Sequence, residues 1–379
     1  MNKTFRKICA KLHLYLGLLS GLVVFIVCIT GCLYVFKNEI NEATQPWRFV
    51  VPEQTEALPP SVILSLADSV MKEGISATAI TYGEKTDAVF VDYHRRGEGQ
   101  KTVFLNPYNG KIQKTIMRSA DDFDFFRFVI RGHRSLWLPK QTGSVIVGYS
   151  VLAFFIALIA GLILWWPPQW TRRALMQRLT MKRPFTFPRL NFDLHRILGF
   201  YAFLPLFVIC FTGLIFSLGW FNKSFYAIVS GGEGLQPNMI PVSDTLQTSS
   251  RVVEPLDSLF YRLKAESPEA KKLSFSLPSK KDGVFRVSVG HRRGSRSRTD
   301  YLFFDRHTLK PLQGSGPFTG KYEDASVVHK LRRMNLELHD GSILGLFGKS
   351  IMFLASLIGA SLPITGFVIW HRKNRRKMR

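Results

Sequence analysis

The sequence predicts a membrane protein with four transmembrane α-helices in a bundle and two α+β domains outside the membrane, produced by an internal tandem duplication. Three observations predict this fold class. The 379 residues contain four apolar runs without charged residues, the basic residues gather in three short segments, and the first and third apolar runs are similar in sequence.

The overall charge has to be reconciled with this fold class. The chain has 51 Lys and Arg against 27 Asp and Glu, a net charge of +24. A balance this basic is typical of nucleic-acid binding. However, 46% of the residues are hydrophobic, 31 are Phe and only 4 are Cys. This composition argues against a nucleic-acid partner, and it excludes a disordered chain or a disulfide scaffold.

Each apolar run is long enough to cross a hydrocarbon core of about 30 Å, which requires roughly 20 apolar residues. The runs are Leu14–Phe36, Val145–Trp166, Ile197–Leu218 and Ile351–Trp370. With their flanks they predict transmembrane segments at 13–37, 143–166, 195–218 and 344–371. The first run lacks a small-residue cleavage site and three spans follow it, so we expect a retained helix rather than a cleaved signal peptide.

The basic residues predict the orientation. Three short segments carry seventeen Lys and Arg and one acidic residue, Asp193. The basic residues are Lys3, Arg6, Lys7, Lys11, Arg172, Arg173, Arg178, Lys182, Arg183, Arg189, Arg196, Arg372, Lys373, Arg375, Arg376, Lys377 and Arg379. The positive-inside rule therefore places the tails 1–12 and 372–379 and the loop 167–194 in the cytoplasm. In a bacterial inner membrane, segments 38–142 and 219–343 would then be periplasmic, and the basic segments would face the lipid headgroups.

The chain contains an internal repeat. Residues 12–31 (LHLYLGLLSGLVVFIVCITG) and 194–213 (LHRILGFYAFLPLFVICFTG) are identical at 9 of 20 positions, at a constant offset of 182. The second and fourth spans are related more weakly, because Ala160-Gly161 and Trp165 correspond to Thr365-Gly366 and Trp370 at an offset of 205. These matches predict a tandem duplication of a unit made of helix, outer domain and helix.

Both outer segments are expected to be small α+β domains. Apolar periodicity and alternation predict one helix and several strands in each. The helices are Ser61–Met71 and Leu256–Lys264, and the strands are Ala77–Tyr82, Ala88–Tyr93, Thr102–Ile112, Lys272–Leu277, Val284–Val289 and Tyr301–Pro311. The third strand of the first segment contains Asn-Pro-Tyr-Asn-Gly, which is typical of a turn.

Two histidines occupy equivalent places in the repeat. His13 and His195 stand at the starts of the first and third spans, each with Gly four residues later and Thr-Gly at the far end of the span. A single His here would be read as an interfacial residue. Two related ones indicate facing helices that offer two neutral imidazoles to one metal.

The ligand set indicates haem rather than a bare ion. A bare ion needs more than two protein ligands, whereas haem needs one or two axial ones. We therefore expect bis-histidine haem b, and the absence of C-x-x-C-H argues against covalent attachment. His133 and His339, at the opposite ends of the second and fourth spans, form the second expected pair, with His329 as the alternative ligand.

Taken together, these motifs resemble the PepSY-associated transmembrane family. The motifs are LHxxLG and TG in the first and third spans, GxxxW in the second and fourth, LHxG before the fourth, and NPYNG. Within the family, the chain resembles the iron-regulated membrane proteins and the periplasmic siderophore reductases. The resemblance implies four helices, two PepSY-type domains and two b-type haems, with His13 and His195 matching the inner ligands and His133 and His339 the outer ones. The turn 306–309 departs from the pattern because it lacks glycine.

For function, the resemblance implies reduction of a ferric siderophore or another periplasmic Fe(III) chelate. The electron would cross the membrane from the cytoplasmic side. Because no G-x-G-x-x-G follows a strand, a separate cytoplasmic flavin or NAD(P)H reductase, or a quinone, is expected as the donor. Aromatic residues near the outer face are candidates for the acceptor site, although an interfacial aromatic belt is the commoner explanation. They are Phe123, Phe125, Phe126, Trp137, Trp220 and Phe221.

Two other functional classes fit parts of the sequence. In the first, the outer domains bind or regulate peptides, peptidases or cell-envelope partners, and the histidines are structural. In the second, the protein is a transporter whose third and fourth spans are broken at Pro205 and Pro363. The lack of charged residues inside the spans argues against the transporter.

Overall fold

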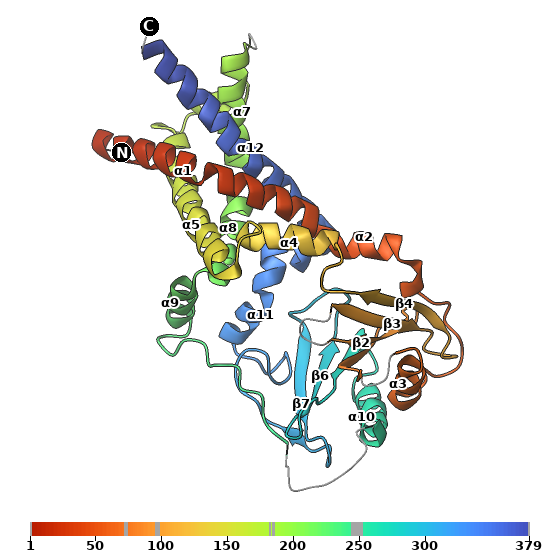
Figure 1. Ribbon diagram of the computed structural model, residues 1–379. Coiled ribbons are helices and arrows are strands. Elements are labelled where there is room, and N and C mark those ends of the chain that lie inside the picture. Colours follow the sequence, from red (N-terminus) through yellow and green to blue (C-terminus); the bar gives the residue numbers. More distant parts are fainter. Residues whose placement is uncertain are drawn as a thin grey trace. The chain divides into compact units, whose positions relative to one another are not determined.

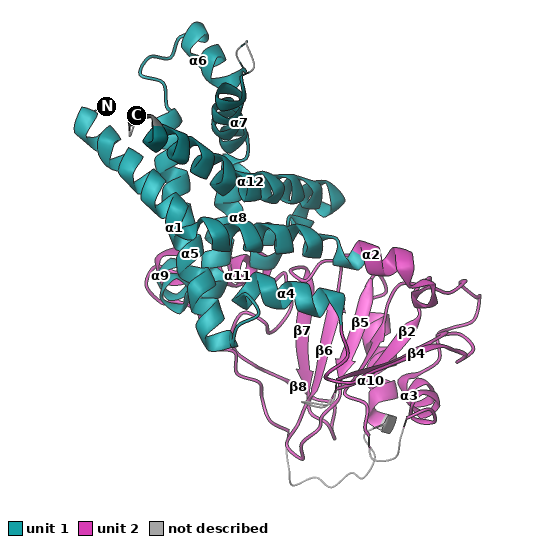
Figure 2. Cartoon of the chain, turned by 45° about the horizontal axis from the view of Figure 1, so that its top comes forward, with its two compact units in different colours: residues 1–38, 124–225, 335–379 teal, residues 39–123, 226–334 magenta. Residues whose placement is uncertain are grey.

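The computed structural model describes residues 2–71, 75–94, 99–181, 183, 186–243 and 253–377. Lys182 and Arg379, two of the basic residues noted above, lie outside this part. The chain divides into two compact units (Figure 2): unit 1 contains residues 1–38, 124–225 and 335–379, and unit 2 contains residues 39–123 and 226–334. Each unit therefore combines segments from both halves of the duplicated chain.

Unit 1 is helical. Its helices are α1 (Lys3–Val35), α4 (Phe125–Ser135), α5 (Lys140–Trp165), α6 (Arg172–Leu179), α7 (Phe187–Tyr201), α8 (Phe203–Ser217) and α12 (Gly345–Lys377), drawn in Figure 1. The division between the units falls within α9 (Gly219–Val229) and α11 (Val327–Asp340) and just after the start of α2 (Lys37–Thr44). The short 3₁₀ turns Pro46–Arg48 and Ser342–Leu344 complete the helical elements of the described chain.

Three stretches of the described chain are helical, long and apolar enough to cross a membrane. They are Lys3–Thr44, Lys140–Trp165 and Ser342–Arg375. A fourth is obtained only if α7 and α8, which meet at an angle of 64°, are counted as one span. The sequence predicted a single helix here, and the structure breaks it at Ala202. Pro205 explains the break, because it has no N–H to donate to the carbonyl of Tyr201.

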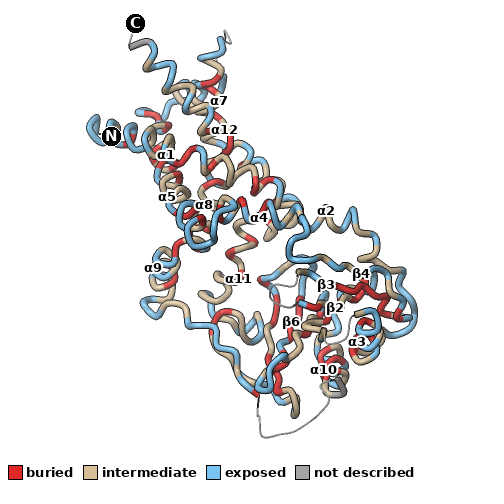
Figure 3. Tube along the Cα trace, in the orientation of Figure 1, coloured by how far each residue is buried: buried red, intermediate tan, exposed pale blue. Residues whose placement is uncertain are grey.

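The interior of the bundle contains apolar and small side chains. Buried residues such as Val24, Leu158, Leu206 and Leu362 form one cluster (Figure 3, red segments of the helices). Large apolar side chains also point outward, as Leu19 does with 78% of its surface exposed. Outward-facing apolar side chains are expected of helices whose solvent is lipid.

Unit 2 contains one eight-stranded antiparallel sheet. Its strands are β1 (Ala79–Tyr82), β2 (Val89–Tyr93), β3 (Gln100–Leu105), β4 (Ile112–Arg118), β5 (Lys272–Ser276), β6 (Phe285–Gly290), β7 (Thr299–Phe304) and β8 (Pro311–Leu312). Their order is β4-β3-β2-β1-β5-β6-β7-β8. The sequence predicted a separate domain from each outer segment. The structure instead joins four strands from each segment through β1 and β5, with Ala79 opposite Ser276 and Tyr82 opposite Leu273. Each segment thereby covers the strand edge that the other would expose.

Two helices cover one face of the sheet. They are α3 (Pro60–Asp68) and α10 (Val253–Glu266), side by side in Figure 1, and both were predicted with slightly different ends. Ile63 and Leu259 are fully buried in the core that these helices form with the strands. The carboxylate of Asp257 accepts hydrogen bonds from the backbone N–H of Ser61 at 2.8 Å and from its hydroxyl at 2.5 Å. A side chain of α10 thus caps the N-terminus of α3.

The turn after β3 and the turn after β7 have the same backbone. In the first, Asn106 pairs with Lys111, and Gly110 has a φ of +72°. In the second, Asp305 pairs with Lys310, and Leu309 has a φ of +55°. The missing glycine has therefore not changed this turn. Leu309 adopts a left-handed conformation that L-residues with a bulky side chain rarely adopt.

Candidate functional site

The four histidines singled out by the sequence form two pairs in unit 1. The ring centroids of His13 and His195 are 6.0 Å apart, with an angle of 79° between the ring planes. Those of His133 and His339 are 6.2 Å apart, at 68°. In both pairs, one histidine comes from each half of the duplicated chain. The geometry therefore depends on the two repeats packing together.

The four rings are anchored in the same way through Nδ1. His13 Nδ1 lies 2.8 Å from the carbonyl oxygen of Ala157. His133 Nδ1 lies 2.9 Å from the carbonyl oxygen of Val27, and His339 Nδ1 lies 3.1 Å from that of Ile209. His195 Nδ1 lies 2.8 Å from the hydroxyl oxygen of Thr365. With Nδ1 held in this way, Nε2 is the nitrogen that each ring can offer to a metal.

A threonine hydroxyl supports three of these four anchors. Besides Thr365 at His195, Thr30 lies 3.3 Å from His133 Nδ1 and Thr212 lies 2.9 Å from His339 Nδ1. Each hydroxyl donates its own proton to a carbonyl of its helix. Its oxygen can therefore accept the Nδ1–H of the histidine. His13 is the exception, because Ala160 occupies the corresponding position.

A glycine next to each of these positions makes room for the ring. A Cβ atom on Gly161 would lie 2.9 Å from Cε1 of His13, and one on Gly366 would lie 3.3 Å from Cε1 of His195. At the second pair, Gly31 is similarly close to His133 at 3.3 Å, and Gly213 to His339 at 3.4 Å. Each imidazole thus lies directly against the helix backbone at a glycine. A residue with a side chain at this glycine position would reduce the space for the ring.

A helix that the sequence did not predict brings His133 to its place. Residue 133 precedes the second span by ten residues, so sequence reasoning required it to reach back toward the membrane. In the structure, α4 packs against α1 and α5 and carries His133 in its last turn. Asp124 caps the start of α4 by accepting a hydrogen bond from Arg127 N–H at 2.7 Å. The left-handed Leu136 ends the helix before α5 begins.

The two pairs lie about five helical turns apart along α1. Eighteen residues separate His13 from Gly31, which backs His133, and they span about 27 Å of helix axis at 1.5 Å per residue. This length is close to the roughly 30 Å thickness of a hydrocarbon core.

The separation within each pair suits two axial ligands of one metal. With a metal–nitrogen bond of about 2.0 Å and a nitrogen about 1.1 Å from the ring centroid, opposed imidazoles have centroids about 6.2 Å apart. Among the described residues, no group of three or more His, Cys, Asp or Glu is arranged around a metal position. The pairs therefore suit a metal that carries its other ligands with it. Burial lowers the pKa of His133 and His339, which lie outside the candidate spans, to about 4, so both rings are neutral near pH 7.

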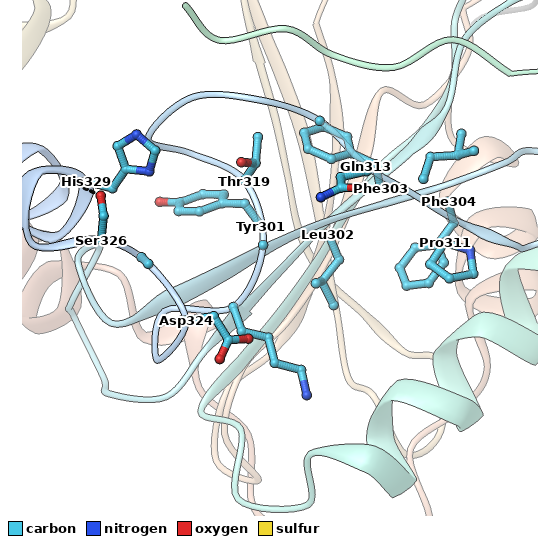
Figure 4. A pocket seen from close by; sticks show the side chains of 15 residues that line it. Tyr301, Leu302, Phe303, Phe304, Pro311, Gln313, Thr319, Asp324, Ser326 and His329 are labelled. Carbon is cyan, nitrogen blue, oxygen red and sulfur yellow. Dashed lines mark hydrogen bonds between the residues drawn. The ribbon is translucent and has the colours of Figure 1, made fainter. Parts of the chain in front are cut away.

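His329, the alternative ligand, lies nearly three turns before His339 on α11 and lines a pocket of unit 2. This pocket has a volume of about 590 Å³ and lies along β7, β8 and the loop that leads to α11 (Figure 4). Tyr301, Ser326 and His329 lie together at one end of it, and Phe304 lies at the other. The backbone N–H of His329 donates to the Ser326 hydroxyl at 3.3 Å. Partial burial and the nearby Arg333 lower the pKa of His329.

Four of the aromatic residues proposed for an acceptor site form pairs within their own helices. Phe125 and Phe126 contact each other on α4, and Trp220 contacts Phe221 on α9. Trp137 instead stacks on Phe128. Phe125, Trp137 and Trp220 are each more than a third exposed.

Sequence reasoning missed the groups that hold the rings. It noted the glycines four residues after His13 and His195 but assigned no contact to those of the Thr-Gly and Ala160-Gly161 pairs. The structure places the glycines of these pairs against the rings. Their signal was present, because these pairs recur at equivalent positions of the repeat. It could not be interpreted without knowing which helices are neighbours.

The fold and the paired histidines define the class: a multi-pass membrane protein with a helical bundle and an antiparallel sheet domain. The chain belongs to the PepSY-associated transmembrane family, since the family model described as the PepSY-associated TM region matches residues 10–373. No curated protein matches the chain.

Proposed function

We propose that the protein is an inner-membrane di-haem b electron-transfer protein that reduces ferric siderophores, or other Fe(III) chelates, in the periplasm. One observation carries this proposal. Two histidine pairs, each with ring centroids at the separation expected for opposed axial ligands, lie about five helical turns apart along α1.

The residues around each pair fit a haem. Each pair supplies two imidazoles with Nδ1 already bound, which matches a group that needs only axial ligands. A Cβ atom on Gly17, one turn after His13, would meet no atom within 4 Å, so space remains beside this pair. When bound, each haem would supply a one-electron Fe(III)/Fe(II) couple.

The chain itself would orient the ligands and exclude water. The Nδ1 bonds fix the tautomer and limit the rotation of each imidazole. Phe203, Phe207 and Phe211 follow one another along α8 with ring centroids 5.9 and 6.1 Å apart, and Phe155 on α5 lies 5.0 Å from Phe207. These rings make the bundle interior apolar, which favours transfer of an electron without an accompanying ion.

The charge distribution supports the direction of transfer. With the basic segments in the cytoplasm, His13 and His195 lie at the cytoplasmic end and His133 and His339 at the periplasmic end. A cytoplasmic flavin or NAD(P)H reductase, or a quinol, would give up the electron. An Fe(III) chelate would accept it outside and become Fe(II), which oxygen ligands hold less tightly because its charge is lower. Iron release then leaves the chelator intact.

An absorption spectrum tests this proposal. Protein purified after haem-replete expression should show b-type bands in the dithionite-reduced minus oxidised spectrum. The reduced protein should then be reoxidised by a ferric siderophore, with formation of Fe(II) that a ferrous chelator traps. Absence of haem would refute the proposal as a whole. Haem that ferric siderophores do not reoxidise would refute the proposed acceptor.

A second function, the binding of a peptide or cell-envelope partner without redox chemistry, is favoured by the pocket in unit 2. Its lining combines aromatic side chains with Gln313, Asp324 and His329. If this is the function, peptide binding to the full-length protein should persist when all four paired histidines are replaced by alanine.

A further inference from the structure

Two arginines from separate segments meet at the C-terminal end of α5, and a third, Arg196, interacts electrostatically with one of them, Arg178. Arg6 on α1 donates to the carbonyl oxygen of Leu164 at 3.1 Å, and Arg178 on α6 donates to that of Trp165. Arg196 on α7 donates to the carbonyl oxygen of Thr180 at 3.3 Å. Desolvation, followed by repulsion from Arg6 and Arg196, lowers the pKa of Arg178.

Two buried donors in this cluster have no acceptor within the described part of the chain. They are the indole Nε1–H of Trp165 and the Nε–H of Arg196. Trp165 is only 6% exposed, and its ring stacks on Phe200 with centroids 3.7 Å apart. Buried donors nearly always have a partner, because leaving one unpaired costs about 1 to 3 kcal/mol. These two therefore indicate a missing acceptor.

The local charge also indicates an anion. Asp193, 1% exposed, accepts from Arg189 at 3.0 Å and from Arg196 at 2.9 Å. One carboxylate cannot balance Arg189, Arg196, Arg6 and Arg178 together. Capping of the last carbonyls of α5 accounts for one N–H each of Arg6 and Arg178, whereas a guanidinium carries five. Capping also leaves the two unpaired donors unexplained.

The cluster lies next to the His13–His195 pair along the chain. Arg6 precedes His13 by seven residues, so both lie on one face of α1 about two turns apart. Trp165 follows Gly161, the glycine that backs His13, by one turn of α5, and Arg196 directly follows His195. A planar ligand held by these histidines can extend a carboxylate over one or two helical turns to the cluster.

We propose that Arg6, Arg178, Arg196 and the indole of Trp165 form an oxyanion site that binds the carboxylates of the macrocycle held by His13 and His195. This inference rests on the proposed function, because it assigns the acidic side chains of that haem to named donors. Arginine suits the role, since its planar N–H fork matches the two oxygens of a carboxylate. The same donors would also fit a phospholipid phosphate, so the experiment has to separate the two sources.

The test compares haem with its dimethyl ester, in which the carboxylates are uncharged. The full-length protein carrying His339→Ala, which leaves the first pair intact, is produced without haem and titrated with each form in detergent. We expect haem to bind at least about tenfold more tightly than the ester. Arg178→Gln should weaken haem binding about tenfold and leave ester binding unchanged. Arg173→Gln, an exposed arginine of the same helix, is the matched control and should change neither.

Several results would overturn the inference. Equal binding of haem and ester would show that no carboxylate is recognised. Equal weakening of both by Arg178→Gln would show that this arginine acts only as a C-terminal cap of α5. Arg6→Gln provides a second variant if Arg178→Gln fails to fold. Native mass spectrometry tests for a bound phospholipid. If it detects one on the parent protein but not on Arg178→Gln, and haem and ester bind equally, the site binds a lipid and not the carboxylates of haem. If neither haem form binds, the proposed function itself fails, which is distinct from a loss of discrimination alone.

Discussion

If the His13–His195 pair binds haem as proposed, replacing Gly161 by alanine should separate the stability of the bundle from its haem affinity. The new Cβ atom would lie 2.9 Å from Cε1 and 3.0 Å from Nδ1 of His13. Carbon atoms in ordinary contact are about 3.5 to 4.0 Å apart, so the ring has to move by roughly 0.5 to 1 Å. Its 2.8 Å bond to the Ala157 carbonyl would then approach or exceed the usual hydrogen-bond limit of about 3.2 Å.

The helix itself should gain from this substitution. Alanine is favoured over glycine in a helix interior by about 1 kcal/mol, which offsets a cost of about 0.5 to 1.5 kcal/mol for weakening the His13 hydrogen bond, so the thermal midpoint of Gly161→Ala should change little. Haem affinity at the His13–His195 pair should fall about 10- to 100-fold, the range typical for loss of a group that orients a metal ligand. This corresponds to about 1.4 to 2.7 kcal/mol.

Haem titration of the apoprotein, followed by reduced minus oxidised spectra and a thermal melt, measures both quantities. Gly213→Ala is the matched control. Its Cβ atom would lie 3.4 Å from His339, so it should leave the first pair unchanged and affect the second only mildly. Wild-type haem affinity in Gly161→Ala would refute the view that this glycine makes room for His13.

Three other predictions follow from the same geometry. His13→Ala and His195→Ala should each remove the same haem and leave the other. The haem content per polypeptide should then be about half that of the wild type, and the full content in either variant would show that the pairing is wrong. Thr365→Val should change the low-spin EPR signal of the His195 haem by removing the hydroxyl that holds Nδ1, whereas Thr365→Ser should retain the wild-type signal; identical spectra of all three proteins would exclude a positioning role. Gly110→Ala should destabilise the sheet unit by about 1 to 3 kcal/mol in denaturant unfolding of the full-length protein, because φ is +72° and the new Cβ atom would clash with Leu66. An unchanged unfolding midpoint would contradict the assigned turn.

The sequence predicted the histidine pairs more completely than their surroundings. His13 and His195 could be paired because they are equivalent in a gapless repeat, and equivalent residues of two packed repeats meet near their common axis. The same equivalence related His133 to His339. It did not predict how the chain brings His133 back toward the spans. That path depends on α4, whose residues Phe126, Val129 and Ile130 have the spacing of an amphipathic helix. The sequence does not show which helices this short segment packs against.

Other features depended on contacts between distant segments. The edge of β1 has no sequence signal that names β5 as its neighbour, since hydrogen bonding between strands involves only backbone. The sequence showed Pro205 inside an apolar run but not whether the run would bend there, because prolines within spans are tolerated when neighbouring helices compensate. Pro363 lies inside an unbroken α12, whereas Pro205 follows a break of 64°.

The sequence by itself determined the membrane class and the duplication, and it singled out the four paired histidines. It could do so because apolar length, charge bias and repeated motifs are properties of consecutive residues. The tertiary structure alone decided what lies against each histidine. Thr30, Thr212, Thr365 and the four glycines act across helix interfaces, where hydrogen bonds and the space left by a missing Cβ arise only once two helices pack. It likewise joined the strands of the two outer segments in one sheet, because each segment leaves a free strand edge that the other can pair.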